Sequence, residues 1–525
     1  MTAHDLYVIS PYLAMAGAAT LIILLDLVVP RKGLLPYLAF LALSAPFVLS
    51  LIQFYDLGDS NTLLRGAEAF SVEEPSILLG SLSVDRFALF FNFLVIGAAA
   101  LVVLASTDYV KRVERFQGEY FGLMLFSATG MMLLAAATEL ITIYIALELT
   151  TLPLAALAAF LMNRQSSEAG MKFLIIGAIS SAVMLYGMAL VFGFTGSTQL
   201  AQIADSIGGA TGDVAFGNYA LLVGIVLMVA GFGFKLSAAP FQMWVPDVYE
   251  GAPTPVVAFL SVASKAAAFA ILLRVFFMGF FDVALDWAAL IAGLAAASMI
   301  FGNAVAMVQT NIRRLFGYST IAHAGYLLVG VAAGVKVAGG GLNLPEFSST
   351  GPDSVLFYLG AYAAANLTAF FAITAISSRV GSDRIADYAG LVTRSPVLAV
   401  TLALALIALV GVPPTSIFIA KLYIFTAAVK ADLTWLAIIG VINSVVSAYY
   451  YIRIVRVMFL QSAEPTAEPT AESTAESTAA AEERPSRSPA PWIALGIAGA
   501  SMLFIGIAPG FVMEAARSAV SALTV

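Results

Sequence analysis

The chain has 525 residues, of which 61% are hydrophobic and only 11% are charged, and its formal net charge is -7. Soluble domains carry about 25% charged residues, so the composition excludes an ordinary soluble protein and predicts an all-α polytopic membrane protein. The absence of cysteine excludes disulfides and thiolate-held zinc or iron-sulfur clusters, and the two histidines, His4 and His323, offer little for haem or copper. We expect no cofactor and no metal in this chain, and no nucleic-acid partner.

About fourteen apolar segments are long enough to cross a bilayer, which takes about 20 helical residues. We expect these spans approximately at 8–29, 35–53, 86–107, 119–138, 140–162, 170–194, 218–243, 254–278, 286–309, 314–336, 355–378, 396–429, 433–460 and 491–513. The first segment follows no basic stretch and is longer than the apolar part of a signal peptide, so we expect it to remain as the first span.

The positions of lysine and arginine provide a test of this number of spans, because these residues accumulate in cytoplasmic loops. Most of them lie in or beside every second connection: Arg31, Lys32, Lys111, Arg112, Arg115, Arg164, Lys172, Arg313, Arg314, Arg379, Arg384, Arg394, Arg453, Arg456, Arg484 and Arg487. The other connections hold a smaller set: Arg65, Arg86, Arg274, Lys336, Lys430 and Arg517. The bias predicts an even number of spans, with both termini on the outer face of the membrane.

Prolines interrupt two of the predicted spans. The apolar run 397–429 would be roughly 50 Å long as one helix at about 1.5 Å per residue, and Pro413 and Pro414 lie in its middle. Pro240 interrupts the span 218–243, five residues after Lys235. Because proline removes a backbone donor and clashes with the preceding turn, both helices are predicted to be discontinuous.

The stretch 462–490, before the last span, is acidic and repetitive and has almost no large apolar side chains. Such a composition cannot form a packed core. We expect a disordered cytoplasmic linker, with a docking segment as the alternative.

Four ionisable residues lie deep within the apolar spans: Glu148, Lys235, Lys265 and Lys421. A charge at the centre of a membrane helix costs roughly 2.5 to 3.5 kcal/mol on insertion scales, so it indicates a functional site with a partner nearby. A lysine can gain or lose a proton as a carboxylate approaches or withdraws. We therefore expect a proton path along these residues. The alternative is a set of structural ion pairs; a metal site would require several oxygen ligands instead.

Three other polar residues have a predicted role. His323 could relay a proton between the lysines, with a packing role as the alternative. Glu139 lies at the junction of two spans, where it can reach water. Arg274 lies one turn from the end of its span, so we expect it to extend toward the membrane surface.

Several motifs resemble those of the subunit N family of respiratory NADH:quinone oxidoreductase, complex I, whose members are antiporter-like membrane subunits. They lie at residues 234–241, 244–255, 311–315, 319–326, 411–415 and 443–451. The resemblance covers nearly the whole chain apart from the acidic stretch. One departure is Gln242, at a position where relatives often carry a histidine.

The resemblance implies two inverted five-helix repeats, each with a broken helix. The chain would then divide into 1–118 (helices 1–3), 119–280 (first repeat), 281–461 (second repeat), 462–490 (acidic loop) and 491–525 (helix 14). By resemblance, Glu148 and Lys235 form the glutamate–lysine pair, Lys265 is the connecting lysine, and Lys421 belongs to the second half-channel. NADH, FMN, iron-sulfur clusters and quinone are implied in partner subunits.

We therefore expect a proton-translocating membrane-arm subunit of NADH:quinone oxidoreductase in the bacterial plasma membrane. Its partners would be the other membrane-arm and peripheral-arm subunits and the lipid bilayer. Three alternatives stay open at this point. They are a subunit of a multisubunit Na⁺/H⁺ antiporter, a subunit of a ferredoxin-fed photosynthetic-type complex, and a structural scaffold whose buried charges only hold helices together.

Overall fold

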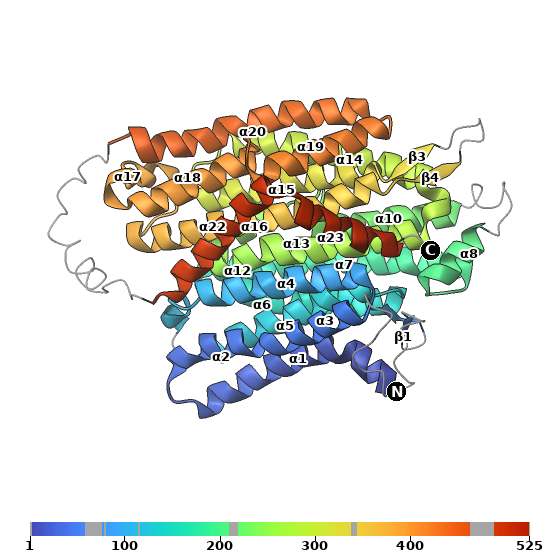
Figure 1. Cartoon of the computed structure of the whole chain (residues 1–525), viewed down its shortest axis with the longest axis horizontal. Helices are drawn as coiled ribbons and strands as arrows, with labels where there is room; N and C mark the ends of the chain where they lie inside the picture. The colour runs from blue at the N-terminus through green and yellow to red at the C-terminus, as the bar shows by residue number, and fades with distance from the viewer. Residues whose placement is uncertain are drawn as a thin grey trace.

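A computed structural model describes residues 3–57, 76–77, 80–113, 116–208, 219–337, 344–462 and 488–523. The described residues form a bundle of helices with two small antiparallel sheets, β1 (Ser76–Ile77) with β2 (Leu82–Ser83) and β3 (Val335–Val337) with β4 (Pro345–Phe347) (Figure 1). Most of the predicted acidic linker, 463–487, lies outside the described residues.

The helices follow the apolar segments of the sequence. They are α1 (Ala3–Val28), α2 (Leu35–Ala42), α3 (Ser44–Asp56), α4 (Arg86–Ala105), α5 (Gln117–Ala136), α6 (Leu140–Ala158), α7 (Arg164–Thr195), α8 (Leu200–Gly208), α10 (Tyr219–Leu236), α11 (Val245–Gly251), α12 (Thr254–Phe259), α13 (Lys265–Arg274), α14 (Ala284–Ala306), α15 (Ile312–Ala332), α16 (Thr350–Val380), α17 (Leu391–Arg394), α18 (Pro396–Val410), α19 (Ser416–Lys430), α20 (Thr434–Leu460), α22 (Ala490–Ile507) and α23 (Gly510–Val520).

Within the described part of the chain, 13 helical runs are long and apolar enough to cross a membrane. The remaining predicted span, 396–429, is occupied by α18 and α19, which have 15 residues each and follow one another across a break. The predicted all-α polytopic fold is confirmed. The start of α1 and the end of α23 lie at the same end of the bundle, as an even number of crossings requires (Figure 1).

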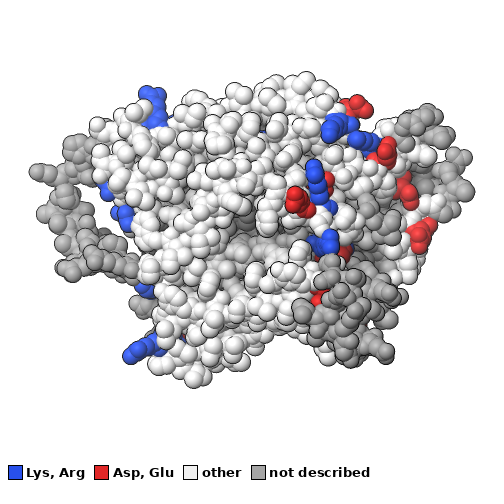
Figure 2. Space-filling view, in the orientation of Figure 1, with Lys and Arg blue, Asp and Glu red and all other residues white. Residues whose placement is uncertain are grey.

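Charged side chains are distributed as a bilayer requires. On the face drawn in Figure 2 they gather toward the two ends of the bundle, and the band between them carries almost none. The two most enclosed runs are Thr254–Gly279 and α15, in which 94% of the apolar window is buried inside the protein. These two helices therefore face other helices on nearly all sides, and they carry Lys265 and His323.

Both predicted helix breaks are present. The helix α10 ends at Leu236 and α11 begins at Val245, with Pro240 between them. The helix α18 ends at Val410 and is followed by Gly411, whose φ of +88° favours glycine. The structure also contains an irregularity that was not predicted. It is the π-helical turn Leu260–Ser264, which lies directly before Lys265. Such turns are frequent at functional sites.

The last membrane helix packs directly on the second break. A Cβ added at Gly506 of α22 would lie 2.2 Å from the Pro414 carbonyl oxygen, whereas one added at Gly496 would meet nothing within 4 Å. Alanine favours a helix interior over glycine by roughly 1 kcal/mol. We expect Gly496→Ala to leave the thermal unfolding midpoint of the assembled complex unchanged or slightly higher, and Gly506→Ala to lower it. Equal midpoints for the two variants would contradict this packing.

Candidate functional site

Lys235 lies at the C-terminal end of α10, directly before the break. It is 8% exposed, its ammonium donates a hydrogen bond to the Thr151 hydroxyl of α6, and it lies 5.1 Å from the centre of the Phe234 ring. No carboxylate of a described residue lies within 4.0 Å of it. The lysine is thus held by a neutral hydroxyl and an aromatic ring.

Glu148 lies one helical turn before Thr151 on α6, so the two side chains share a face. The Ser181 hydroxyl of α7 donates to its Oε1 atom at 2.5 Å. The Glu148 carboxylate is close enough to act electrostatically on Lys235, and Thr151 is the hydroxyl that contacts the lysine. The structure therefore brings the predicted pair together without a direct ion pair. Glu139, in contrast, precedes α6 and accepts hydrogen bonds from Thr142 and Thr198, as its helix-end position predicts.

Lys265 is the first residue of α13, directly after the π-helical turn. It is 2% exposed, its Nζ donates to the Thr320 carbonyl oxygen of α15 at 2.6 Å, and it lies 5.2 Å from the centre of the Tyr362 ring. The Thr320 hydroxyl is hydrogen-bonded to the Tyr362 hydroxyl at 2.8 Å and accepts from Tyr249 at 3.2 Å. Lys265 is therefore held by a backbone carbonyl and an aromatic ring, and the hydroxyls of Thr320, Tyr362 and Tyr249 are hydrogen-bonded to one another beside it.

His323 lies one turn after Thr320 on α15. Its Nδ1 is hydrogen-bonded to the Tyr358 hydroxyl at 2.7 Å, and its ring lies 4.9 Å from that of Tyr362. Both Lys265 and Lys421 act electrostatically on this imidazole. The structure thus places His323 within electrostatic range of two lysines and in contact with a hydroxyl, and its role as a relay stays a prediction.

Lys421 lies on α19 beyond the second break. Its Nζ donates to the Val410 carbonyl oxygen and to the Ser444 hydroxyl, both at 2.8 Å, and lies 4.7 Å from the centre of the Tyr326 ring. Val410 is the last residue of α18, where carbonyls have no partner within the helix. The negative end of a half-helix therefore holds the lysine, and the helix break itself supplies the ligand.

A set of buried hydroxyl and amide groups that was not predicted lies near His323 and Lys421. Asn303 accepts a hydrogen bond from Tyr450 at 3.0 Å and donates to Asn443 at 3.3 Å, and Ser319 is hydrogen-bonded to Tyr451. The whole set comprises Tyr249, Asn303, Ser319, Thr320, Tyr326, Tyr358, Tyr362, Asn443, Tyr450 and Tyr451. The signal for it in the sequence is the recurrence of Ser, Thr and Tyr at helical spacing inside apolar spans. Hydroxyls both donate and accept, so such a set can pass protons.

A sequence model of the family described as NADH:quinone oxidoreductase/Mrp antiporter, transmembrane, matches residues 137–447, a range that includes Glu148, Lys235, Lys265, His323 and Lys421. NADH-quinone oxidoreductase subunit N of Dehalococcoides mccartyi is 41% identical over 508 residues, covering 95% of this chain and 96% of the relative. The chain belongs to this family.

Solved structures agree with this membership of the NADH:quinone oxidoreductase/Mrp antiporter family. A chain of respiratory complex I from Thermus thermophilus with bound aureothin is 30% identical, with a TM-score of 0.72 over 96% of this chain and 98% of that one. A chain of the Mrp complex from Dietzia sp. is 20% identical, with a TM-score of 0.79 over 100% and 98%. The second likeness shows a shared fold.

The prediction that Arg274 extends toward the membrane surface is wrong. Arg274 is fully buried and forms a two-point ion pair with Asp85, with Nη1–Oδ2 at 3.0 Å and Nη2–Oδ1 at 2.9 Å. Its Nε donates to the Ala135 carbonyl oxygen at 2.9 Å, and its guanidinium lies 5.0 Å from the centre of the Phe87 ring. Because α13 runs through the interior of the bundle, its last turn faces protein rather than lipid or headgroups.

Two remaining observations concern ligands. Gln242, which stands in the break between α10 and α11, is buried, and its Oε1 has no hydrogen-bond partner among the described residues. Across those same residues, no group of three or more His, Asp and Glu side chains is arranged to hold a metal ion.

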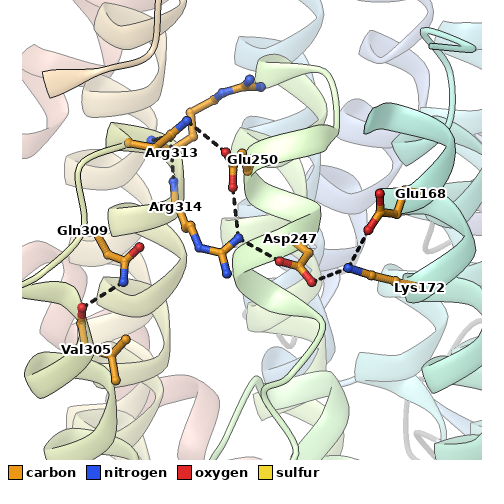
Figure 3. A network of polar contacts seen from close by, with 9 residues as sticks. Glu168, Lys172, Asp247, Glu250, Val305, Gln309, Arg313 and Arg314 are labelled. Atoms are coloured by element: carbon orange, nitrogen blue, oxygen red, sulfur yellow. Dashed lines mark hydrogen bonds and ion pairs between the residues drawn. The ribbon is translucent and has the colours of Figure 1, made fainter. Parts of the chain in front are cut away.

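A surface network fixes the short helix α11 that follows the first break (Figure 3). Lys172 of α7 contacts Glu168 at 2.8 Å and Asp247 of α11 at 2.7 Å. Arg314 of α15 contacts Asp247 at 2.8 Å and Glu250 of α11 at 3.0 Å. The network joins α7 to α15 through α11.

The Asp247 carboxylate stays charged near neutral pH. Partial burial alone would raise the pKa of Asp247, but hydrogen bonds from Lys172 and Arg314 outweigh it and hold that pKa below its ordinary value. A carboxyl whose pKa is depressed on folding stabilises the folded state above its unfolded pKa, which is about 4, and this contribution is lost only as the pH falls further.

Asp247 is therefore the residue whose negative charge links Lys172 of α7 to Arg314 of α15. We expect Asp247→Asn to lower the thermal unfolding midpoint of the complex at pH 7 by about 2 °C, because partly exposed pairs contribute at most about 1 kcal/mol each. Glu168→Gln is the control, since this exposed carboxylate contacts the same Lys172 but not α11. The difference between the variants should shrink as the pH falls below about 4, and vanish once the pH is low enough to protonate Asp247 in the folded protein, where its pKa lies below the ordinary value. Equal midpoints at pH 7 would refute a special role for Asp247.

Proposed function

We propose that this protein is a proton-translocating membrane-arm subunit of an NADH:quinone oxidoreductase. The observation that carries the proposal is the series of buried protonatable side chains, Glu148, Lys235, Lys265, His323 and Lys421, each held by hydroxyls, rings or a backbone carbonyl. The chain has no cysteine to hold an iron-sulfur cluster. By its membership of the family, we place the clusters, FMN, NADH oxidation and quinone reduction in partner subunits.

The first step of the mechanism uses Glu148 and Lys235. A buried ammonium is unfavourable unless a negative charge lies nearby. With Glu148 charged and close, Lys235 holds its proton; when the carboxylate moves away or is neutralised, the ammonium releases it. Because Thr151 contacts the lysine and no direct ion pair locks it, a small displacement of α6 against α10 changes this interaction.

The second step carries the proton from Lys265 toward Lys421. Lys265 contacts Thr320, whose hydroxyl bonds Tyr362, and the ring of Tyr362 packs against His323. His323 accepts or donates through Tyr358, and both lysines act on it. Since two positive charges repel a third, His323 carries a proton most easily when one of the lysines has released its own.

We infer that the chain is organised as the repeats 119–280 and 281–461, between helices 1–3 and helix 14. One broken span in each segment, α10–α11 and α18–α19, supports this division. We place the chain in the bacterial plasma membrane with both termini outside. In support, the described charged side chains at the end of the bundle away from the N-terminus are lysine and arginine alone on the face drawn in Figure 2.

Replacing the lysines tests the function. We expect Lys235→Met and Lys421→Met each to abolish proton pumping by the assembled complex, because methionine keeps the length of the side chain and removes the proton-binding group. Pumping is measured as fluorescence quenching of a pH-sensitive dye in proteoliposomes, with assembly checked by native electrophoresis. Lys430→Met is the control, because Lys430 lies exposed at the end of the helix that carries Lys421. Wild-type pumping by both buried variants would favour the structural scaffold.

The hydroxyl that contacts Lys235 can be tested separately. A hydrogen bond to a charged group contributes about 1.5 to 3 kcal/mol, which corresponds to roughly a 10- to 100-fold change in an equilibrium constant. We therefore expect Thr151→Val to lower the pumping rate at least tenfold. Thr150→Val is the matched control: this adjacent buried threonine makes the same bond to the carbonyl four residues earlier, and no lysine contacts it. Equal loss in both variants would show a packing effect only.

A further inference from the structure

Asn303 lies where the helices α14 and α15 approach each other closely. A Cβ added at its neighbour Gly302 would lie 2.6 Å from the Ala322 backbone nitrogen of α15, and one added at Gly325 of α15 would lie 2.8 Å from the Ala295 carbonyl oxygen of α14. Residues without a side chain let two membrane helices bring their backbones together in this way. Asn303 is therefore anchored on a tightly packed pair of helices, and it is fully buried.

The amide of Asn303 connects this pair to α20. Its Oδ1 accepts a hydrogen bond from the Tyr450 hydroxyl of α20 at 3.0 Å. Its Nδ2 donates to the Asn443 amide oxygen of α20 at 3.3 Å, to the Met299 carbonyl oxygen of its own helix at 2.9 Å, and to the Tyr326 hydroxyl of α15 at 3.5 Å. Unlike a hydroxyl, an amide has separate donor and acceptor atoms. Asn303 therefore holds its partners in one arrangement rather than exchanging roles with them.

Two of these partners are continuous with the groups that hold Lys421. Ser444, which accepts a hydrogen bond from the Lys421 ammonium at 2.8 Å, is the next residue after Asn443 on α20. Tyr326 places the centre of its ring 4.7 Å from the same ammonium. Asn303 thus lies behind both the hydroxyl and the ring that stabilise the lysine, without contacting the lysine itself.

The titratable groups around Lys421 come from three of the five helices packed against α19, because α18 and α22 carry none. Tyr326 and His323 belong to α15, Tyr358 of α16 is hydrogen-bonded to His323, and Tyr450 of α20 is hydrogen-bonded to Asn303. None of the charged side chains of these three helices makes an ion pair or hydrogen bond with Lys421 in the described structure: Arg313, Arg314, Asp353, Arg379, Arg453 and Arg456. The stability of the ammonium therefore depends on neutral groups and on their placement.

We propose that Asn303 is a positioning residue for Lys421, which fixes the Ser444 hydroxyl and the Tyr326 ring against the ammonium and so sets how readily Lys421 gains and releases its proton. A hydrogen bond weakens steeply as its angle departs from linearity, and a ring stabilises a cation only when the cation lies close to its face. Both contacts favour the charged form of the lysine, so a helix α20 that is no longer held would weaken that form. The inference rests on the proposed function.

The pH dependence of pumping by the assembled complex tests this role. Without Asn303 the ammonium loses support, so Lys421 keeps its proton only at lower pH. We expect Asn303→Ala to move the alkaline limb of the pumping profile in proteoliposomes by about one unit toward lower pH, the shift expected from the loss of one hydrogen bond to a charged group. Met299→Ala is the matched control: it opens a larger cavity one turn earlier on α14 and removes no hydrogen-bonding atom, so the profile should keep its position. An unchanged profile in Asn303→Ala, or an equal shift in Met299→Ala, would overturn the proposal.

A double-mutant cycle tests whether the amide acts through the hydroxyl. Ser444→Ala should shift the profile in the same direction as Asn303→Ala, because it removes the hydrogen bond to Lys421 directly. Residues that act through one another are not additive, so the double variant should shift the profile by less than the sum of the two single shifts. Full additivity would show that Asn303 does not position Ser444.

The outcomes separate this inference from the function on which it rests. If Lys421→Met abolishes pumping and Asn303→Ala keeps the wild-type profile, the positioning role is refuted and the proposed function stands. If Lys421→Met pumps at the wild-type rate, the proposed function fails and the positioning role fails with it. Should Asn303→Ala not assemble, Tyr450→Phe removes the hydroxyl that donates to Asn303 and almost no volume, and a wild-type profile in that variant overturns the positioning role equally.

Discussion

The arrangement of this protein depends on one constraint, the free energy of holding an ammonium group inside a membrane protein. The effective desolvation penalty still amounts to several kcal/mol per ion after the protein has relaxed. Each of the three buried lysines meets this cost with neutral groups: the Thr151 hydroxyl, the Thr320 carbonyl, and the Val410 carbonyl with Ser444. An aromatic ring lies about 5 Å from each ammonium. These contacts lower the cost without removing it, and a cation that is only partly stabilised can lose its proton.

The two helix breaks follow from the same constraint. A continuous membrane helix has no free carbonyl to offer, because each one is bonded four residues further along the chain. Ending α18 at Val410 releases a carbonyl oxygen at the depth where Lys421 needs it. The first break has a different role. Lys235 lies on the half-helix before it, and α11 is the half-helix after it. Ion pairs among Lys172, Asp247 and Arg314 join α11 to α7 and α15. A broken helix thus supplies both a ligand and a connection between the two halves of the chain.

The sequence was sufficient to predict what depends on local composition. Apolar length defines the spans, Pro240 and the pair Pro413 and Pro414 define the breaks, and the buried charges stand out against their apolar neighbours. What it did not predict depends on helices far apart in the chain. The partner of Arg274 is Asp85, 189 residues away, so position within one span wrongly indicated surface exposure. The π-helical turn before Lys265 has no distinctive residue to mark it, and the hydroxyl that contacts Lys235 comes from a helix 84 residues earlier.

The contrast between Arg274 and the lysines explains which buried cations can carry protons. Arginine keeps its charge at all accessible pH values and matches a carboxylate at two points, and with Asp85 it forms a closed pair with every strong interaction satisfied. Such a pair fixes helices but has no proton to exchange. Lys235, Lys265 and Lys421 lack a direct carboxylate among the described residues, so the balance between their charged and neutral forms responds to small movements of Glu148 or to the protonation of His323. Under the proposed function, an incomplete set of partners is therefore the feature that would distinguish a conducting site from a structural one in this bundle.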